Sequence, residues 1–141
     1  MNQKIGQSMD TIGMFCRLNM NTRRDLPIRS SEMGVLIFMH KHGEPVTPVM
    51  ISQFFRIKKP SVTTMINHLL EGQYLTKIKS ESDGRSYTVQ MTQKAIKLVS
   101  ESYEAYLKNV EVIHQEMGDD DFNMFIKLME KANQALSKEK S

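Results

Sequence analysis

The histidines are the side chains in this sequence that come closest to a metal site. His40 and His42 lie on either side of a lysine, and Glu44 follows two positions later. Imidazole and carboxylate groups bind zinc, but a complete site needs further ligands at a defined spacing, and the sequence offers none. Serine, histidine and aspartate residues occur without a nucleophile motif, and there is no glycine-rich phosphate loop. We therefore expect no metal site, no cofactor and no enzymatic activity.

The one cysteine, Cys16, leaves a second kind of chemistry open. A single cysteine cannot form a disulfide within the chain, which favours a reducing cytoplasm as the compartment. Arg17 beside it could stabilise a thiolate, so Cys16 is a candidate redox site. The alternative is a buried, unreactive cysteine.

A row of short polar side chains between residues 60 and 70 is the strongest candidate for a binding surface. The row recurs at helical spacing and lies opposite an apolar stripe. The row is Ser61, Thr64, Asn67 and His68, with Pro60 and Thr63 on its flank, and the apolar stripe is Val62, Ile66, Leu69 and Leu70. A helix in the major groove of DNA needs such small hydrogen-bonding groups, because base edges are read at close range. A solvent-exposed helix face would more usually carry lysine and glutamate.

Charge is distributed unevenly along the chain, whose net charge is only +3. Residues 50–90 contain six lysines and arginines against three acidic residues, whereas residues 91–141 contain seven against nine. A polyanion is therefore attracted to the middle of the chain. The candidate phosphate-binding cations there are Lys58, Lys59, Lys77, Lys79 and Arg85.

Start and stop signals predict the helices that must position these residues. A first helix is expected over residues 3–20 from its apolar spacing. A second begins where Ser30 can act as N-cap and ends at Gly43. Thr47 followed by Pro48 begins a short third helix, because proline at the first helical position loses no needed N–H.

The third and fourth helices are followed by two strands. The third helix is expected to bury Ile51, Phe54 and Phe55, and the fourth runs from Lys59 to about Glu71. Strands are expected over 74–80 and 86–91, because apolar and polar residues alternate in the second of them. A turn with Gly84 at its tip joins the two strands. This order predicts a mainly α fold with a small β-hairpin wing, a winged helix-turn-helix.

The last third of the chain is helical, with apolar residues spaced as in a coiled coil. Thr92 caps a long helix whose apolar residues recur in steps of three and four, a period of 3.5 residues. That seam is Ile96, Val99, Tyr103, Tyr106, Val110, Ile113 and Met117. Gly118 ends the helix, and the acidic residues 119–121 favour the start of another. Apolar seams of this kind can pack against each other within one chain or against a second chain. We expect the second arrangement, a homodimer.

Candidate dimerisation residues come from both ends of the chain. They are Ile5, Met9, Ile12, Val110, Ile113, Phe122, Phe125 and Met129. The expected organisation is a single chain, 1–141, with a DNA-binding lobe at 30–91. Residues 1–25 and 92–141 form the helical dimerisation region.

From Ile51 to Ala95 the sequence resembles the multiple antibiotic resistance regulator (MarR) family of winged-helix transcription factors. The family's wing pattern is Asp, any residue and Arg, then after a few residues apolar, any residue, apolar and Thr. Here it reads Asp83, Gly84, Arg85 and then Val89, Gln90, Met91, Thr92. The resemblance implies that Arg85 contacts DNA and that Asp83 orients it. The family usually has a glycine just before the first wing strand, where this sequence has Gln73 after Gly72.

Together these features predict a sequence-specific DNA-binding transcriptional regulator. We expect a homodimer that acts as a repressor on a pseudo-palindromic operator and responds to a small-molecule effector. The alternatives are a redox sensor of the same fold that uses Cys16, or a helical protein-interaction dimer that does not bind DNA. No apolar run approaches the roughly 18 residues of a membrane span, and no signal peptide is evident, so we expect a cytoplasmic protein.

Overall fold

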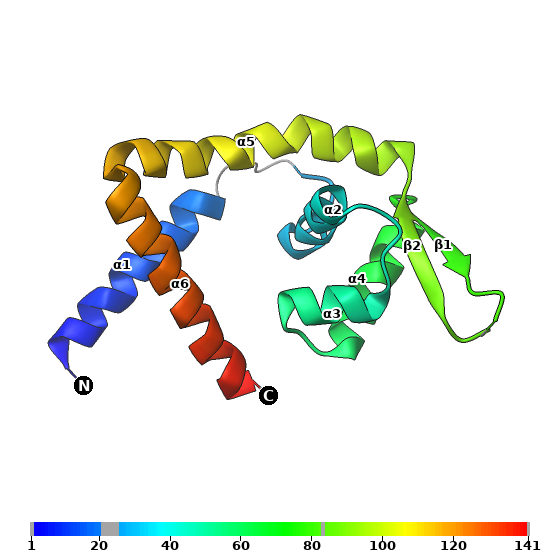
Figure 1. Ribbon diagram of the computed structural model, residues 1–141, viewed down its shortest axis with the longest axis horizontal. Helices are drawn as coiled ribbons and strands as arrows, with labels where there is room; N and C mark the ends of the chain where they lie inside the picture. The colour runs from blue at the N-terminus through cyan, green and yellow to red at the C-terminus, as the bar shows by residue number, and fades with distance from the viewer. Residues whose placement is uncertain (1, 21–25, 83, 141) are drawn as a thin grey trace.

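The computed structural model describes residues 2–20, 26–82 and 84–140 and contains helices with one β-hairpin (Figure 1). The elements are α1 (Gln3–Met20), α2 (Ser30–His42), α3 (Pro48–Phe55), α4 (Lys59–Glu71), β1 (Leu75–Lys79), β2 (Tyr87–Met91), α5 (Gln93–Met117) and α6 (Asp119–Lys140). The predicted mainly α winged-helix fold is confirmed. None of the described helices combines the length and apolarity that crossing a membrane requires.

Two of the predicted helix caps are present as hydrogen bonds. The Thr47 hydroxyl accepts from the Met50 N–H at 3.1 Å at the start of α3. The Thr92 hydroxyl accepts from the Ala95 N–H at 3.3 Å at the start of α5. Each bond satisfies one backbone donor that has no partner inside its helix.

The expectation that Ser30 caps α2 is wrong by one position. The cap is Arg29, which has extended backbone angles, and Ser30 is the first helical residue. The Arg29 N–H donates to Oε1 of Glu32 at 3.0 Å. The glutamate three residues after the cap therefore satisfies the cap's own N–H, as in a capping box.

One apolar core is formed by α2, α3, α4, the hairpin and the first part of α5. We call this unit the lobe, residues 26–82 and 84–102. Its fully buried side chains include Met33, Leu36, Met39, Ile51, Val62, Ile66, Leu69 and Val89. The core continues past residue 91, because α5 contributes Ala95, Leu98 and Val99 to it.

The buried face of α5 differs from the predicted seam in its first turns. Ile96 is 41% exposed, whereas Ala95 and Leu98 beside it are buried. The 3.5-residue period described an interface with another long helix. In its first turns α5 packs on α2 of the lobe instead, and this rotates the buried face by about one residue.

The hairpin is antiparallel and is extended at one edge by the loop after α2. Leu75 pairs with Met91, and Lys79 pairs with Tyr87. Val46 exchanges two backbone hydrogen bonds with Val89, at 3.2 and 2.8 Å. The wing is thereby fixed to the loop that leads into α3.

The rest of the chain forms what we call the frame: α1, residues 103–117 of α5, and α6. In Figure 1, α1 and α6 lie below the far end of α5, away from the hairpin. The Phe15 and Phe125 rings make an edge contact at 5.8 Å, and the Asn109 amide donates to Oδ1 of Asn19 at 3.3 Å. The frame nevertheless leaves many large apolar side chains exposed, including Ile5, Met9, Ile12, Leu18, Met124 and Leu136.

Lobe and frame also meet through the C-terminal end of α3. Arg56, in the left-handed backbone conformation, forms an ion pair with Glu130 of α6 at 2.8 Å. The expectation that α3 buries Phe54 is wrong, since Phe54 is 60% exposed. Its ring stacks on Phe38 at 4.3 Å, and its other side faces a groove of about 710 Å³ between α3 and α6.

Candidate nucleic-acid interface

The polar row of α4 faces outward because three apolar side chains fix the opposite side of the helix in the core. Val62, Ile66 and Leu69 are buried. The exposed members of the row and its flank are Pro60, Ser61, Thr63, Thr64 and Asn67. Lys58 is the N-cap of the helix, and Lys59 occupies its first position. The helix dipole and both lysines therefore present positive charge at one end of a surface of small hydrogen-bonding groups.

A groove of about 460 Å³ brings three of the predicted DNA-binding residues together from two elements. Lys59 and Thr63 line it from the start of α4, and Arg85 lines it from the wing. Thr47 and Ser86 also line this groove, and the sequence did not mark either of them as a DNA-binding residue. Thr47 was recognised only as a helix cap, because its proximity to α4 depends on how α3 packs.

The wing carries the other predicted cations. Lys77 and Lys79 are exposed and lie on the same face of β1, two residues apart. The Lys77 ammonium lies 4.2 Å from the centre of the Tyr87 ring, a cation–π contact that restrains it. Arg85 is exposed just before β2. Asp83 lies outside the described residues, so its predicted role in orienting Arg85 stays a prediction.

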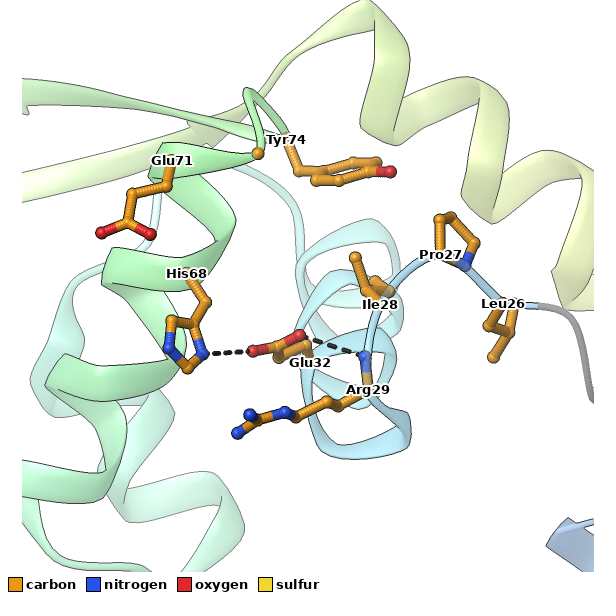
Figure 2. Close-up of a pocket in the computed structure, with 9 residues that line it drawn as sticks. Leu26, Pro27, Ile28, Arg29, Glu32, His68, Glu71 and Tyr74 are labelled. Atoms are coloured by element: carbon orange, nitrogen blue, oxygen red, sulfur yellow. Dashed lines mark hydrogen bonds and ion pairs between the residues drawn. The ribbon is translucent and has the colours of Figure 1, made fainter.

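His68, the last residue predicted for the polar row, points toward α2 (Figure 2). Its Nδ1 lies 2.9 Å from Oε2 of Glu32. Glu32 could not be predicted as its partner, because no local signal connects the first turn of α2 to a histidine 36 positions later. His68 is thus placed differently from the exposed members of its row.

The three residues of the candidate metal site, His40, His42 and Glu44, each contact a different residue. His40 makes an edge contact with the Tyr103 ring at 5.4 Å, and His42 lies beside Phe38 at 5.3 Å between ring centres. Glu44 accepts a hydrogen bond from the Met91 N–H at 3.1 Å. Within residues 2–20, 26–82 and 84–140, no three histidine, cysteine or acidic side chains gather in a way that could hold a metal ion.

Cys16, the candidate redox residue, is exposed on α1. The neighbouring Arg17 guanidinium donates to the sulfur of Met14 at 3.9 Å. Arg17 therefore contacts a thioether one turn earlier in the same helix.

The predicted dimerisation residues fall into two groups. Ile5, Met9, Ile12, Val110 and Met129 are exposed. The other three are half-buried within the chain. Phe125 contacts Phe15, Phe122 lies 4.7 Å from the His114 ring, and Ile113 lines an apolar cavity of about 280 Å³ between α1 and α5.

Comparison with known proteins identifies the fold and finds a matching family model. The sequence model described as MarR family matches residues 25–86. A search of curated protein sequences finds no significant match.

Several solved structures are similar over nearly the whole chain. A variant of MarR from E. coli, solved with operator DNA, is 15% identical with a TM-score of 0.75, covering 92% of this chain and 94% of that one. FabT from Streptococcus pneumoniae, solved in complex with DNA, is 23% identical with a TM-score of 0.73, covering 96% and 97%. The adhesin competence repressor from Streptococcus pyogenes is 16% identical with a TM-score of 0.75, covering 94% and 97%. At these identities the similarity shows the fold.

The arrangement of α3, α4 and the hairpin defines a winged helix-turn-helix protein. Residues 25–86 match the sequence model of the MarR family, the family that the wing pattern resembles.

Proposed function

We propose that the protein is a DNA-binding transcriptional regulator in which α4 reads the major groove of double-stranded DNA. The observation that carries this proposal is the groove shared by Lys59, Thr63 and Arg85, next to the exposed polar row of α4. Small hydroxyl and amide groups can reach base edges, while the cations around them neutralise phosphates. Two of the similar structures were solved with DNA, which also supports the proposal. The proposal includes no catalytic step.

In this proposal the wing contacts the DNA beside α4. Arg85 extends from the end of the hairpin toward the minor groove. The negative potential of a narrow minor groove favours an arginine, whose guanidinium is more weakly hydrated than an ammonium. Lys77 and Lys79 contact phosphates from the adjacent face of β1.

We further propose that the protein acts as a homodimer on a pseudo-palindromic operator. The support is the exposed apolar surface of the frame, where Ile5, Met9 and Ile12 are each more than half exposed. Covering such a surface with a second copy stabilises both chains, and two-fold symmetry then presents two α4 helices. The half-sites that they read would lie about 34 Å apart, one helical turn.

The regulatory part of the proposal is repression that a small-molecule effector relieves. One of the similar structures is the adhesin competence repressor, whose name supports this choice. A promoter carrying the operator should be repressed by the protein. An effector found by screening should release the protein from the operator without separating the dimer.

Selection of duplexes from a random pool, followed by titration of the selected sequence, tests the proposal. The protein should select a two-fold related sequence and bind it more weakly as salt rises. Asn67→Ala should relax the preference at one position of each half-site, by about 1–3 kcal/mol. Lys59→Ala should weaken the selected and scrambled duplexes alike.

The contrary result would be recovery of no duplex and no binding at low salt. In that case the protein would be a helical interaction dimer without DNA binding.

A further inference from the structure

Glu32 is a buried carboxylate that holds two parts of the lobe at once. It is 4% exposed. Its Oε1 accepts from the Arg29 N–H at 3.0 Å, and its Oε2 lies 2.9 Å from Nδ1 of His68. An ionised carboxylate can only accept, so the His68 ring donates from Nδ1. One side chain thus connects the first turn of α2 to the last turn of α4.

This contact lies in a shallow cavity of about 630 Å³ that is lined by both polar and apolar residues (Figure 2). Arg29 and Glu71 contribute the other charges, and Tyr74 forms part of the wall. Because Glu32 is buried, it cannot reach a DNA duplex lying on the exposed row of α4. Any effect of Glu32 on DNA recognition must therefore pass through another residue.

His68 lies on the same stripe of α4 as the residues proposed to read bases. Thr64 precedes it by one turn and Ser61 by two, so the three side chains share an angular position on the helix. A rotation of α4 by about 20° would move side-chain tips, roughly 5 Å from the helix axis, by about 2 Å. Hydrogen-bond lengths vary by only about 0.5 Å, so such a rotation would break contacts to base edges.

The apolar contacts of α4 set which face of the helix is buried in the core. Val62, Ile66 and Leu69 pack by contacts that have no directional preference. The bond from His68 to Glu32 is directional and lies at one edge of the buried face. It adds a directional restraint on small rotations of α4 to the packing that sets which face is buried.

We propose that Glu32 is a positioning residue for sequence recognition, acting through His68 to fix the rotation of α4. The inference rests on the proposed function, and it assigns His68 to the fold of the lobe and not to a base. Sequence preference then depends on a residue that does not touch DNA. Binding through phosphates, which tolerates small rotations, depends on it much less.

Two substitutions of His68 separate positioning from direct base contact. His68→Asn keeps an N–H donor close to the position of Nδ1, whereas His68→Leu removes the donor at similar size. We expect His68→Leu to lose at least tenfold in affinity for the selected duplex and less than twofold for a scrambled duplex. His68→Asn should stay within about twofold of wild type on both duplexes. If the ring itself read a base, both variants would lose affinity for the selected duplex alike, and the proposal would be overturned.

A second pair of variants guards against misfolding, because His68→Leu leaves the buried Glu32 carboxylate without its partner. In Glu32→Gln the amide oxygen still accepts from Arg29, and the amide nitrogen can donate to Nδ1. We expect Glu32→Gln to bind nearly as wild type. Glu32→Gln combined with His68→Leu contains no unpaired charge and should lose the same tenfold or more on the selected duplex. Wild-type preference in this double variant would overturn the proposal.

A measurement without DNA keeps this inference distinct from the proposed function. Nitrogen NMR of the imidazoles at about pH 8, where an ordinary imidazole is neutral, reports which ring nitrogen bears the proton. We expect the proton on Nδ1 of His68 in the wild type and on Nε2 in Glu32→Gln. A proton on Nε2 in both proteins would refute the contact. If the contact is observed but the wild type prefers no duplex, the proposed function fails instead.

Discussion

The lobe and the frame bury their apolar side chains to very different degrees. Leu36 in the lobe is fully buried, whereas Leu136 in α6 of the frame is 64% exposed. Among the residues that the structure describes, the sixteen buried hydrophobic ones all lie between Met33 and Val99, inside the lobe. The lobe therefore has its own core, while the frame leaves an apolar surface exposed that the proposed dimer would cover. The difference fits the division of labour that we propose, with recognition in the lobe and assembly in the frame.

The strongest test of this contrast removes the same group from each region. Leu36→Ala should lower the free energy of unfolding by about 2–5 kcal/mol, because it empties a filled core. Leu136→Ala should cost the single chain less than about 1 kcal/mol, since within one chain the side chain is mostly in solvent. Chemical denaturation of both variants measures the difference. Equal losses would contradict the contrast between the two regions.

The second prediction concerns the frame as an interface between copies. Ile12→Glu places a charge in the exposed apolar stripe of α1 and should weaken dimerisation at least a hundredfold, about 2.7 kcal/mol. Gln7→Glu adds the same charge on the opposite side of α1 and serves as the control. Sedimentation should give the 16.3 kDa monomer for the first variant and twice that mass for the second. A monomeric wild type would contradict the proposal that the frame joins two copies.

The third prediction concerns the cation contributed by the wing. Arg85→Ala should weaken operator binding about tenfold, or 1.4 kcal/mol, and reduce the salt slope by about one ion. Lys108→Ala removes the same charge from the exposed surface of α5 in the frame and should leave both quantities unchanged. Titration at several salt concentrations compares the two variants. Equal effects would mean that the duplex responds to net charge and not to the wing.

The smallest expected effects are two changes in stability, of opposite sign, at the neighbouring residues Gly72 and Gln73. A Cβ added at Gly72 would lie 2.9 Å from Cδ2 of the buried Tyr74 ring, so Gly72→Ala should destabilise the lobe by about 1 kcal/mol. Gln73 has a φ of 65°, in the left-handed region that favours glycine. Gln73→Gly should therefore stabilise the lobe by about 0.5 kcal/mol. Thermal unfolding of the two variants checks both signs, and destabilisation by Gln73→Gly would contradict this reading of the turn.

Features encoded within a few residues were predictable from the sequence. The caps Thr47 and Thr92, the proline that begins α3 and the outward face of α4 each follow from local hydrogen bonding or helical spacing. The wing pattern ending at Thr92 also resembles the family whose model matches residues 25–86. Such signals need no knowledge of what the element packs against.

Features that depend on the packing of distant elements could not be predicted in this way. The 3.5-residue seam placed Ile96 inward, but the first turns of α5 meet α2 and bury Leu98 instead. Phe54 has the character of a core residue, yet it stacks on one ring and faces a groove. The pairing of Glu32 with His68 arises only when α2 and α4 lie side by side.

In the proposed complex, two lobes that are joined by the frame read one duplex. Light scattering of the wild-type protein with its selected duplex tests it most directly. The account predicts a complex with the mass of the duplex plus twice the 16.3 kDa chain, and protection of two half-sites about 10 base pairs apart. One chain per duplex, or no complex at low salt, would contradict it.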